Sequence, residues 1–69
     1  MTNISNPRNL IVGKYYVFDG LDPEHAPIGE AFDSLKAAES ERRSLNCADD
    51  CHVGIAILHK NAVILGRPQ

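Results

Sequence analysis

The sequence predicts a small α+β domain in which a three- or four-stranded, mainly antiparallel sheet carries one α-helix on one face. The chain has 69 residues, which is room for a single domain. Segments rich in β-branched and aromatic residues flank one segment of strong helix formers. We expect the element order ββαββ, with βαββ as the alternative. The domain should span residues 10–67 and follow a flexible N-terminal tail over residues 1–9.

The first half of the domain is predicted to be a wide β-hairpin. Residues 10–19, LIVGKYYVFD, have the β-branched and aromatic content of a strand. A polar loop with two prolines follows, and residues 28–32 then alternate between large and small side chains, which is typical of a short second strand.

A helix is predicted over residues 34–46, where Ala, Leu, Glu, Lys and Arg dominate. Asp33 and Ser34 both have short oxygen-bearing side chains that can cap the first backbone N–H groups of a helix. Asn46 is the predicted C-terminal cap.

Two further strands are predicted over residues 51–59 and 62–66. Lys60 and Asn61 between them fit a two-residue hairpin turn, because asparagine tolerates a positive φ angle. Lysine fits that position less well, so a longer loop is the alternative.

The register of this hairpin makes both of its faces apolar. A two-residue turn places Leu58 opposite Val63 and Ile57 opposite Ile64, and these two pairs point to opposite faces. A single helix can cover only one face, so the other face needs a different cover. The residues predicted to form an interface are Tyr15, Val17, Ala56, Leu58, Val63 and Leu65.

We therefore predict a non-catalytic protein-interaction module that acts through an apolar sheet face or edge. Its partner would be a second copy, giving a homodimer, or a larger protein. The alternative is that the tail and the long loop fold across the second face. Replacing Leu58 or Val63 by aspartate distinguishes an interaction face from a face covered by the chain itself. A variant at an interface stays folded, whereas a variant in the core does not.

The cysteines suggest a second hypothesis, a small metal- or redox-responsive protein. Cys47, Cys51 and His52 are the weak candidate ligands, since the C-x₃-C spacing lies within the range of zinc sites. A second ligand pair is missing, so no metal site is predicted. The two cysteines could equally be free or joined by a disulfide.

Neither catalysis nor a cofactor is predicted. Acidic side chains lie near His25, but in a Pro- and Gly-containing loop where solvation is the expected state; they are Asp19, Asp22, Glu24 and Glu30. The chain contains no Ser-His-Asp order, glycine-rich phosphate loop or nucleophile elbow.

Charge and hydropathy argue against two further classes of function, nucleic-acid binding and membrane insertion. The formal net charge is −2, and the aromatic residues Tyr15, Tyr16 and Phe18 have little basic surround, so direct nucleic-acid binding is not expected. A small acidic protein could instead inhibit host nucleic-acid machinery, as a phage or mobile-element product would. No apolar run reaches the length of a membrane span and the N-terminus lacks the apolar core of a signal peptide, so we expect a cytoplasmic protein.

Overall fold

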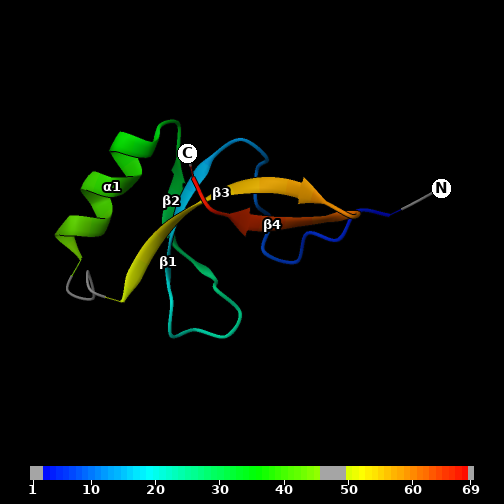
Figure 1. The fold of residues 1–69 in the computed structure, drawn as a ribbon, viewed down its shortest axis with the longest axis horizontal. Helices are drawn as coiled ribbons and strands as arrows, with labels where there is room; N and C mark the ends of the chain where they lie inside the picture. The colour runs from blue at the N-terminus through cyan, green and yellow to red at the C-terminus, as the bar shows by residue number, and fades with distance from the viewer. Residues whose placement is uncertain (1–2, 46–49, 69) are drawn as a thin grey trace.

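The computed structural model describes residues 3–45 and 50–68 and confirms the α+β class and the ββαββ order. Four strands form one antiparallel sheet in the order β2-β1-β3-β4, and one helix packs on it (Figure 1). The elements are β1 (Tyr15–Asp19), β2 (Pro27–Phe32), α1 (Leu35–Ser44), β3 (Cys51–His59) and β4 (Ala62–Gly66). Within the described ranges, no helix combines the length and apolar character needed to cross a membrane.

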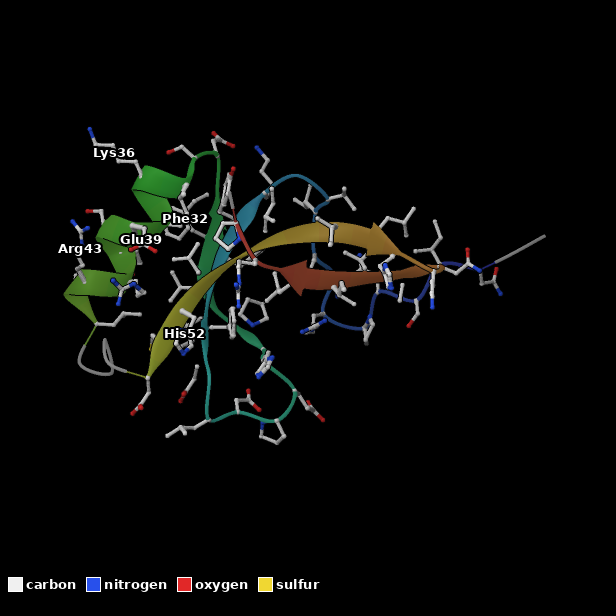
Figure 2. The ribbon with its side chains drawn as sticks, in the orientation of Figure 1. Phe32, Lys36, Glu39, Arg43 and His52 are labelled. Carbon is white, nitrogen blue, oxygen red and sulfur yellow. The ribbon has the colours of Figure 1, made fainter. Side chains whose placement is uncertain are left out.

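One face of the sheet packs against α1. Val17 and Val53 pair across β1 and β3 and are buried together with Ala38 of the helix. Phe32 of β2 packs against this cluster. Figure 2 shows Phe32 between α1 and the sheet, while Lys36 projects from the outer side of the helix. This helix-side core therefore involves β1, β2 and β3.

Part of the opposite face is covered by the N-terminal segment. Leu10, Tyr16, Ala56 and Val63 form a second buried cluster there. Ser5 adds a short parallel bridge to the outer edge of β4 at Ala62. Ser5 and Leu10 thus contact the sheet, whereas we expected residues 1–9 to be a flexible tail.

β1 begins at Tyr15, five residues later than predicted. Gly13 has a φ angle of 94°, and the Lys14 N–H donates to the Ile11 carbonyl, so the chain turns at the place where the strand was expected. Leu10 is then free to pack under the sheet instead of extending β1.

The N-terminus of α1 is capped as predicted, and its end comes earlier. The Ser34 hydroxyl accepts a hydrogen bond from the Ala37 N–H. The helix ends at Ser44 with Leu45 as its C-cap, and the Leu45 N–H donates to the Arg42 carbonyl. The predicted cap Asn46 lies outside the described residues.

The β1–β2 pairing contains a bulge. Tyr15 and Val17 are two positions apart, but their partners Phe32 and Ile28 are four positions apart. Gly29 lies within the bulge at a φ angle of 79°. The bulge adds an even number of residues, so Ile28 and Phe32 both still face the helix-side core.

Gly29→Ala is expected to lower the free energy of unfolding by about 1–2 kcal/mol, because an L-residue at positive φ is strained. An added Cβ would meet no atom within 4 Å, so the whole effect should come from the backbone. Chemical denaturation measures it. A change below a few tenths of a kcal/mol would contradict the assigned conformation.

The predicted two-residue turn between β3 and β4 is confirmed. Both turn residues have positive φ angles, 48° at Lys60 and 65° at Asn61, and His59 pairs with Ala62. This is the pattern of a type I′ turn, whose twist matches that of the flanking strands.

Candidate interaction surface

The β3–β4 hairpin extends beyond the rest of the sheet. β1 pairs with β3 between Ile55 and Cys51 and does not pair with residues 57–59. Figure 1 shows α1 at one end of the sheet and the β3–β4 hairpin projecting toward the other. We name residues 57–64 the hairpin arm.

The helix-side face of the hairpin arm carries the aliphatic pair Ile57 and Ile64 at its base and the pair His59 and Ala62 next to the turn, and it is partly uncovered. Ile57 and Ile64 are cross-strand partners, and both point to the same face as Ile55 and Val53 because side chains alternate along a strand. Burial falls along this face from Val53, 8% exposed, to Ile57, 37% exposed. The cause is the position of α1, which packs against the Val53 end of the sheet (Figure 1).

The opposite face of the arm is divided between core and surface. Leu58 and Val63 are cross-strand partners, yet Leu58 is 53% exposed and Val63 only 4%. The Val63 N–H donates to the Ser5 carbonyl, and Leu10 packs in the same cluster as Val63. The N-terminal segment therefore covers the β4 half of this face and leaves the β3 half open.

The six residues predicted to form an interface do not form one surface. Tyr15 and Val17 lie on the helix side, and Val17 is fully buried there. Ala56 and Val63 are buried in the opposite cluster, and Leu65 packs against that cluster. Leu58 is the member that presents a large exposed side chain.

Sequence reasoning missed the helix-side residues Ile57 and Ile64. We assigned that face to the helix along its whole length, whereas the ten-residue helix reaches only part of it. The predicted lengths of the helix and of the strand could have shown that the helix covers only part of this face. A helix of ten residues spans about 15 Å, while a nine-residue strand spans about 30 Å.

A charged pair lies at the base of the arm. The Lys14 ammonium donates to the Asp33 carboxylate, and the Lys14 carbonyl accepts from the Ala56 N–H of β3. Asp33 directly precedes the helix cap, so the pair links the start of β1 to the start of α1. This hydrogen bond and the positive charge of Lys14 lower the pKa of Asp33.

A folded-state pKa below the unfolded value means that the Asp33 carboxylate stabilises the fold above its unfolded pKa of about 3.9. This contribution should be lost as pH falls through the lower folded pKa. The effect should be small, since both side chains are solvated. Asp33→Asn should therefore flatten the acid limb of a plot of unfolding free energy against pH. An unchanged acid limb would contradict the pairing.

The described residues do not bring the candidate metal ligands together. Cys51 is disulfide-bonded and buried, so its sulfur has no thiolate to offer a metal. Cys47 lies outside the described residues. His52 is exposed on the opposite face of β3, with its ring 5.9 Å from that of Phe18. Among residues 3–45 and 50–68, no group of three His, Cys, Asp or Glu side chains could hold a metal.

At the acidic loop between β1 and β2, two aspartate side chains accept hydrogen bonds from nearby backbone N–H groups. The Asp22 carboxylate accepts from the N–H groups of Glu24 and Ala26, and the Asp19 carboxylate accepts from that of Leu21. The carboxylates therefore hold turns, as short acidic side chains commonly do. The exposed His25 ring lies 4.9 Å from the ring of Phe18.

The aromatic residues do not form one platform for nucleic-acid bases. Tyr15 packs on the helix side, and Tyr16 is buried on the other face with its hydroxyl accepting from the Ile11 N–H. Phe18 shares the face of Tyr16 but lies between two histidine rings. Stacking of successive bases needs exposed rings on a common face.

Comparison of the chain with protein-family models, with curated proteins and with solved structures finds no match.

Proposed function

We propose that this protein is a non-catalytic protein-interaction module and that the helix-side face of the hairpin arm is its contact surface. The observation that carries the proposal is the exposure of Ile57, directly opposite the partly buried Ile64, on a hairpin that projects from the domain. Full burial of an aliphatic side chain contributes roughly 1.5–3 kcal/mol, so covering this face favours association.

The partner that we propose is a second copy of the chain. Ile55, Ile57 and Ile64 are uncharged aliphatic side chains, so the part of the face that they form can meet its copy without repulsion or desolvation of ions. His59 lies on the same face but nearer the turn, at the edge of such a contact. A two-fold axis would place the same aliphatic residues on both sides, as an isologous interface requires. A larger protein with an apolar patch is the alternative partner.

Contact through the face is favoured over contact through the outer edge of β4. Ser5 occupies part of that edge, where its N–H donates to the Asn61 carbonyl and its carbonyl accepts from the Val63 N–H. An edge already hydrogen-bonded to its own chain offers fewer groups to a partner strand.

Sedimentation velocity of the full chain over a wide concentration range tests the proposal. We expect a reversible shift from monomer to dimer that persists at high salt, because the contact is apolar. A monomer at every concentration would reject self-association. An affinity capture with Ile57→Asp as the negative control would then test the alternative partner.

A further inference from the structure

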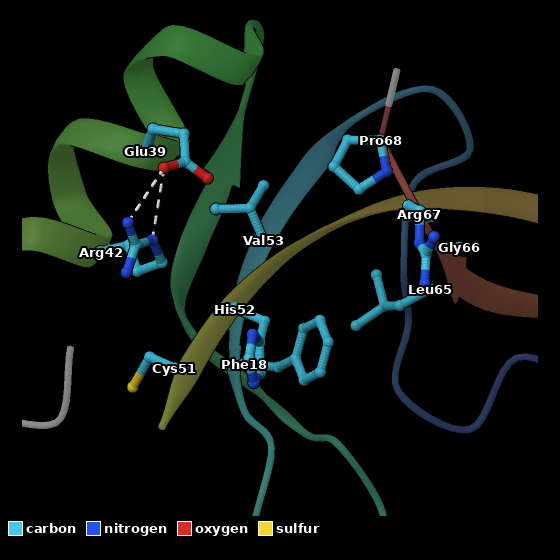
Figure 3. Close-up of a pocket in the computed structure, with 10 residues that line it drawn as sticks. All are labelled: Phe18, Glu39, Arg42, Cys51, His52, Val53, Leu65, Gly66, Arg67 and Pro68. Atoms are coloured by element: carbon cyan, nitrogen blue, oxygen red, sulfur yellow. Dashed lines mark hydrogen bonds and ion pairs between the residues drawn. The ribbon is translucent and has the colours of Figure 1, made fainter. Parts of the chain in front are cut away.

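A second surface lies at the other end of β3. A groove of about 660 Å³ runs between α1 and the end of β4 (Figure 3). Its lining includes Val53 and His52 of β3, Phe18 of β1, Leu65 of β4 and the segment Arg67–Pro68. The hairpin arm residues Ile57 and Leu58 do not line it, so the two surfaces are separate.

The groove follows a stretch of β3 that β4 does not pair with. The last pair of the β3–β4 ladder is Ile55 with Gly66. The Ala56 backbone bonds toward Gly13 and Lys14, on the β1 side. Because successive residues of a strand point their backbone groups to opposite edges, those of Val53 point away from β1.

Pro68 explains why β4 cannot continue along this edge. In the register of the ladder, a longer β4 would bring Pro68 opposite Val53. Proline has no backbone N–H and cannot donate to the Val53 carbonyl. Within residues 3–45 and 50–68, the edge at Val53 therefore lacks the strand partner that residues 55–59 of β3 have in β4.

The lining side chains come from both faces of the sheet. Val53 points to the helix side, while Phe18, His52 and Leu65 point to the other. Gly54 lies between Phe18 and Leu65, and a Cβ there would be 3.1 Å and 3.0 Å from their nearest atoms. A groove that wraps around a strand edge in this way has the shape that an added strand fills.

Among the described residues that line the groove, Arg67 carries the one positive charge that no acidic lining residue offsets. Glu39 accepts hydrogen bonds from Arg42, and these opposite charges offset each other (Figure 3). Arg67 forms no ion pair within residues 3–45 and 50–68. An incoming negative charge would therefore be attracted at the Arg67 end.

We propose that this groove binds an extended acidic peptide segment of another protein by adding it as a strand along β3. The backbone of Val53 provides hydrogen bonds, Val53 and Leu65 provide apolar contacts on alternate faces, and Arg67 selects acidic side chains. This inference does not depend on dimerisation through the hairpin arm.

Selection from a displayed library of random linear seven-residue peptides, with the full chain as bait, tests this inference. We expect enrichment of sequences that alternate apolar and acidic residues. A synthetic copy of an enriched peptide should shift the amide resonances of residues 52–54. Arg67→Glu should weaken its binding by about tenfold. Lys36→Glu, the same charge change on the outer side of α1, should leave binding unchanged.

Several results would overturn the proposal. They are the absence of enriched peptides, enrichment of basic sequences, preferential binding of oligonucleotides at this groove, and equal loss of binding in Arg67→Glu and Lys36→Glu. Enriched peptides that shift only residues 57–64 would also overturn it. That outcome would still support the hairpin arm as a contact surface, so the two proposals can fail separately.

Discussion

Val63→Asp is expected to unfold the protein, whereas Leu58→Asp is expected to leave it folded. The two residues are direct cross-strand partners on the same face, and they carry the same aspartate in the two variants. They differ in burial: Val63 is 4% exposed, whereas Leu58 is 53% exposed. The pair therefore tests whether the N-terminal segment covers β4.

The expected size of the Val63 effect follows from two terms. Losing the buried aliphatic side chain costs about 1.5–3 kcal/mol, and an unpaired buried charge costs about 3–5 kcal/mol more. A chain of 69 residues has a total stability of roughly 3–10 kcal/mol. Leu58→Asp should cost about 1 kcal/mol or less, since the carboxylate stays in water.

Circular dichroism and urea denaturation of both variants provide the measurement. We expect an unfolded spectrum or a collapse of the transition midpoint for Val63→Asp alone. Equal destabilisation of the two variants would mean that Leu58 is also core. Two stable variants would mean that the second face is open at Val63 and that the N-terminal segment does not cover it.

Ile57→Asp is expected to abolish association while the domain stays folded. The substitution places a charge in the centre of the proposed contact, where it would be buried without a partner in the dimer. The side chain is 37% exposed in the single chain, so the carboxylate can remain solvated there. The expected loss of affinity is about 3 kcal/mol or more, which is over a hundredfold.

Leu21→Asp is the matched control for this variant. Leu21 is 75% exposed, but it lies in the loop between β1 and β2, away from the hairpin arm. Sedimentation velocity should show dimer for the wild type and Leu21→Asp, and monomer for Ile57→Asp. Equal association of all three proteins would exclude Ile57 from the interface.

Local sequence patterns were sufficient to predict the order of the elements, the helix N-cap and the turn between β3 and β4. Ser34 has a capping side chain directly before a run of helix formers, and the two-residue turn at Lys60 and Asn61 follows from the strands on either side. These features depend on neighbours in the chain, so one sequence is enough to find them.

Which segments bury which residues on each face of the sheet could not be predicted in the same way. The residue type of Leu10 predicts the start of a strand. The chain turns at Gly13, which has a positive φ angle, and Leu10 packs in the same cluster as Val63 instead. Tyr15 and Val17 were grouped with Leu58, although the β1–β3 register places them on the helix side. Such contacts join distant segments, and periodicity alone cannot assign them.

Concentration-dependent NMR of the full chain tests the central claim, that the helix-side face of the hairpin arm is the contact surface. On raising the protein concentration, we expect amide shifts centred on Ile55, Ile57 and Ile64, together with slower hydrogen exchange in the arm. The loop around Leu21 should not change. Shifts confined to β2 or α1, or no shifts at concentrations where the mass is dimeric, would contradict the claim.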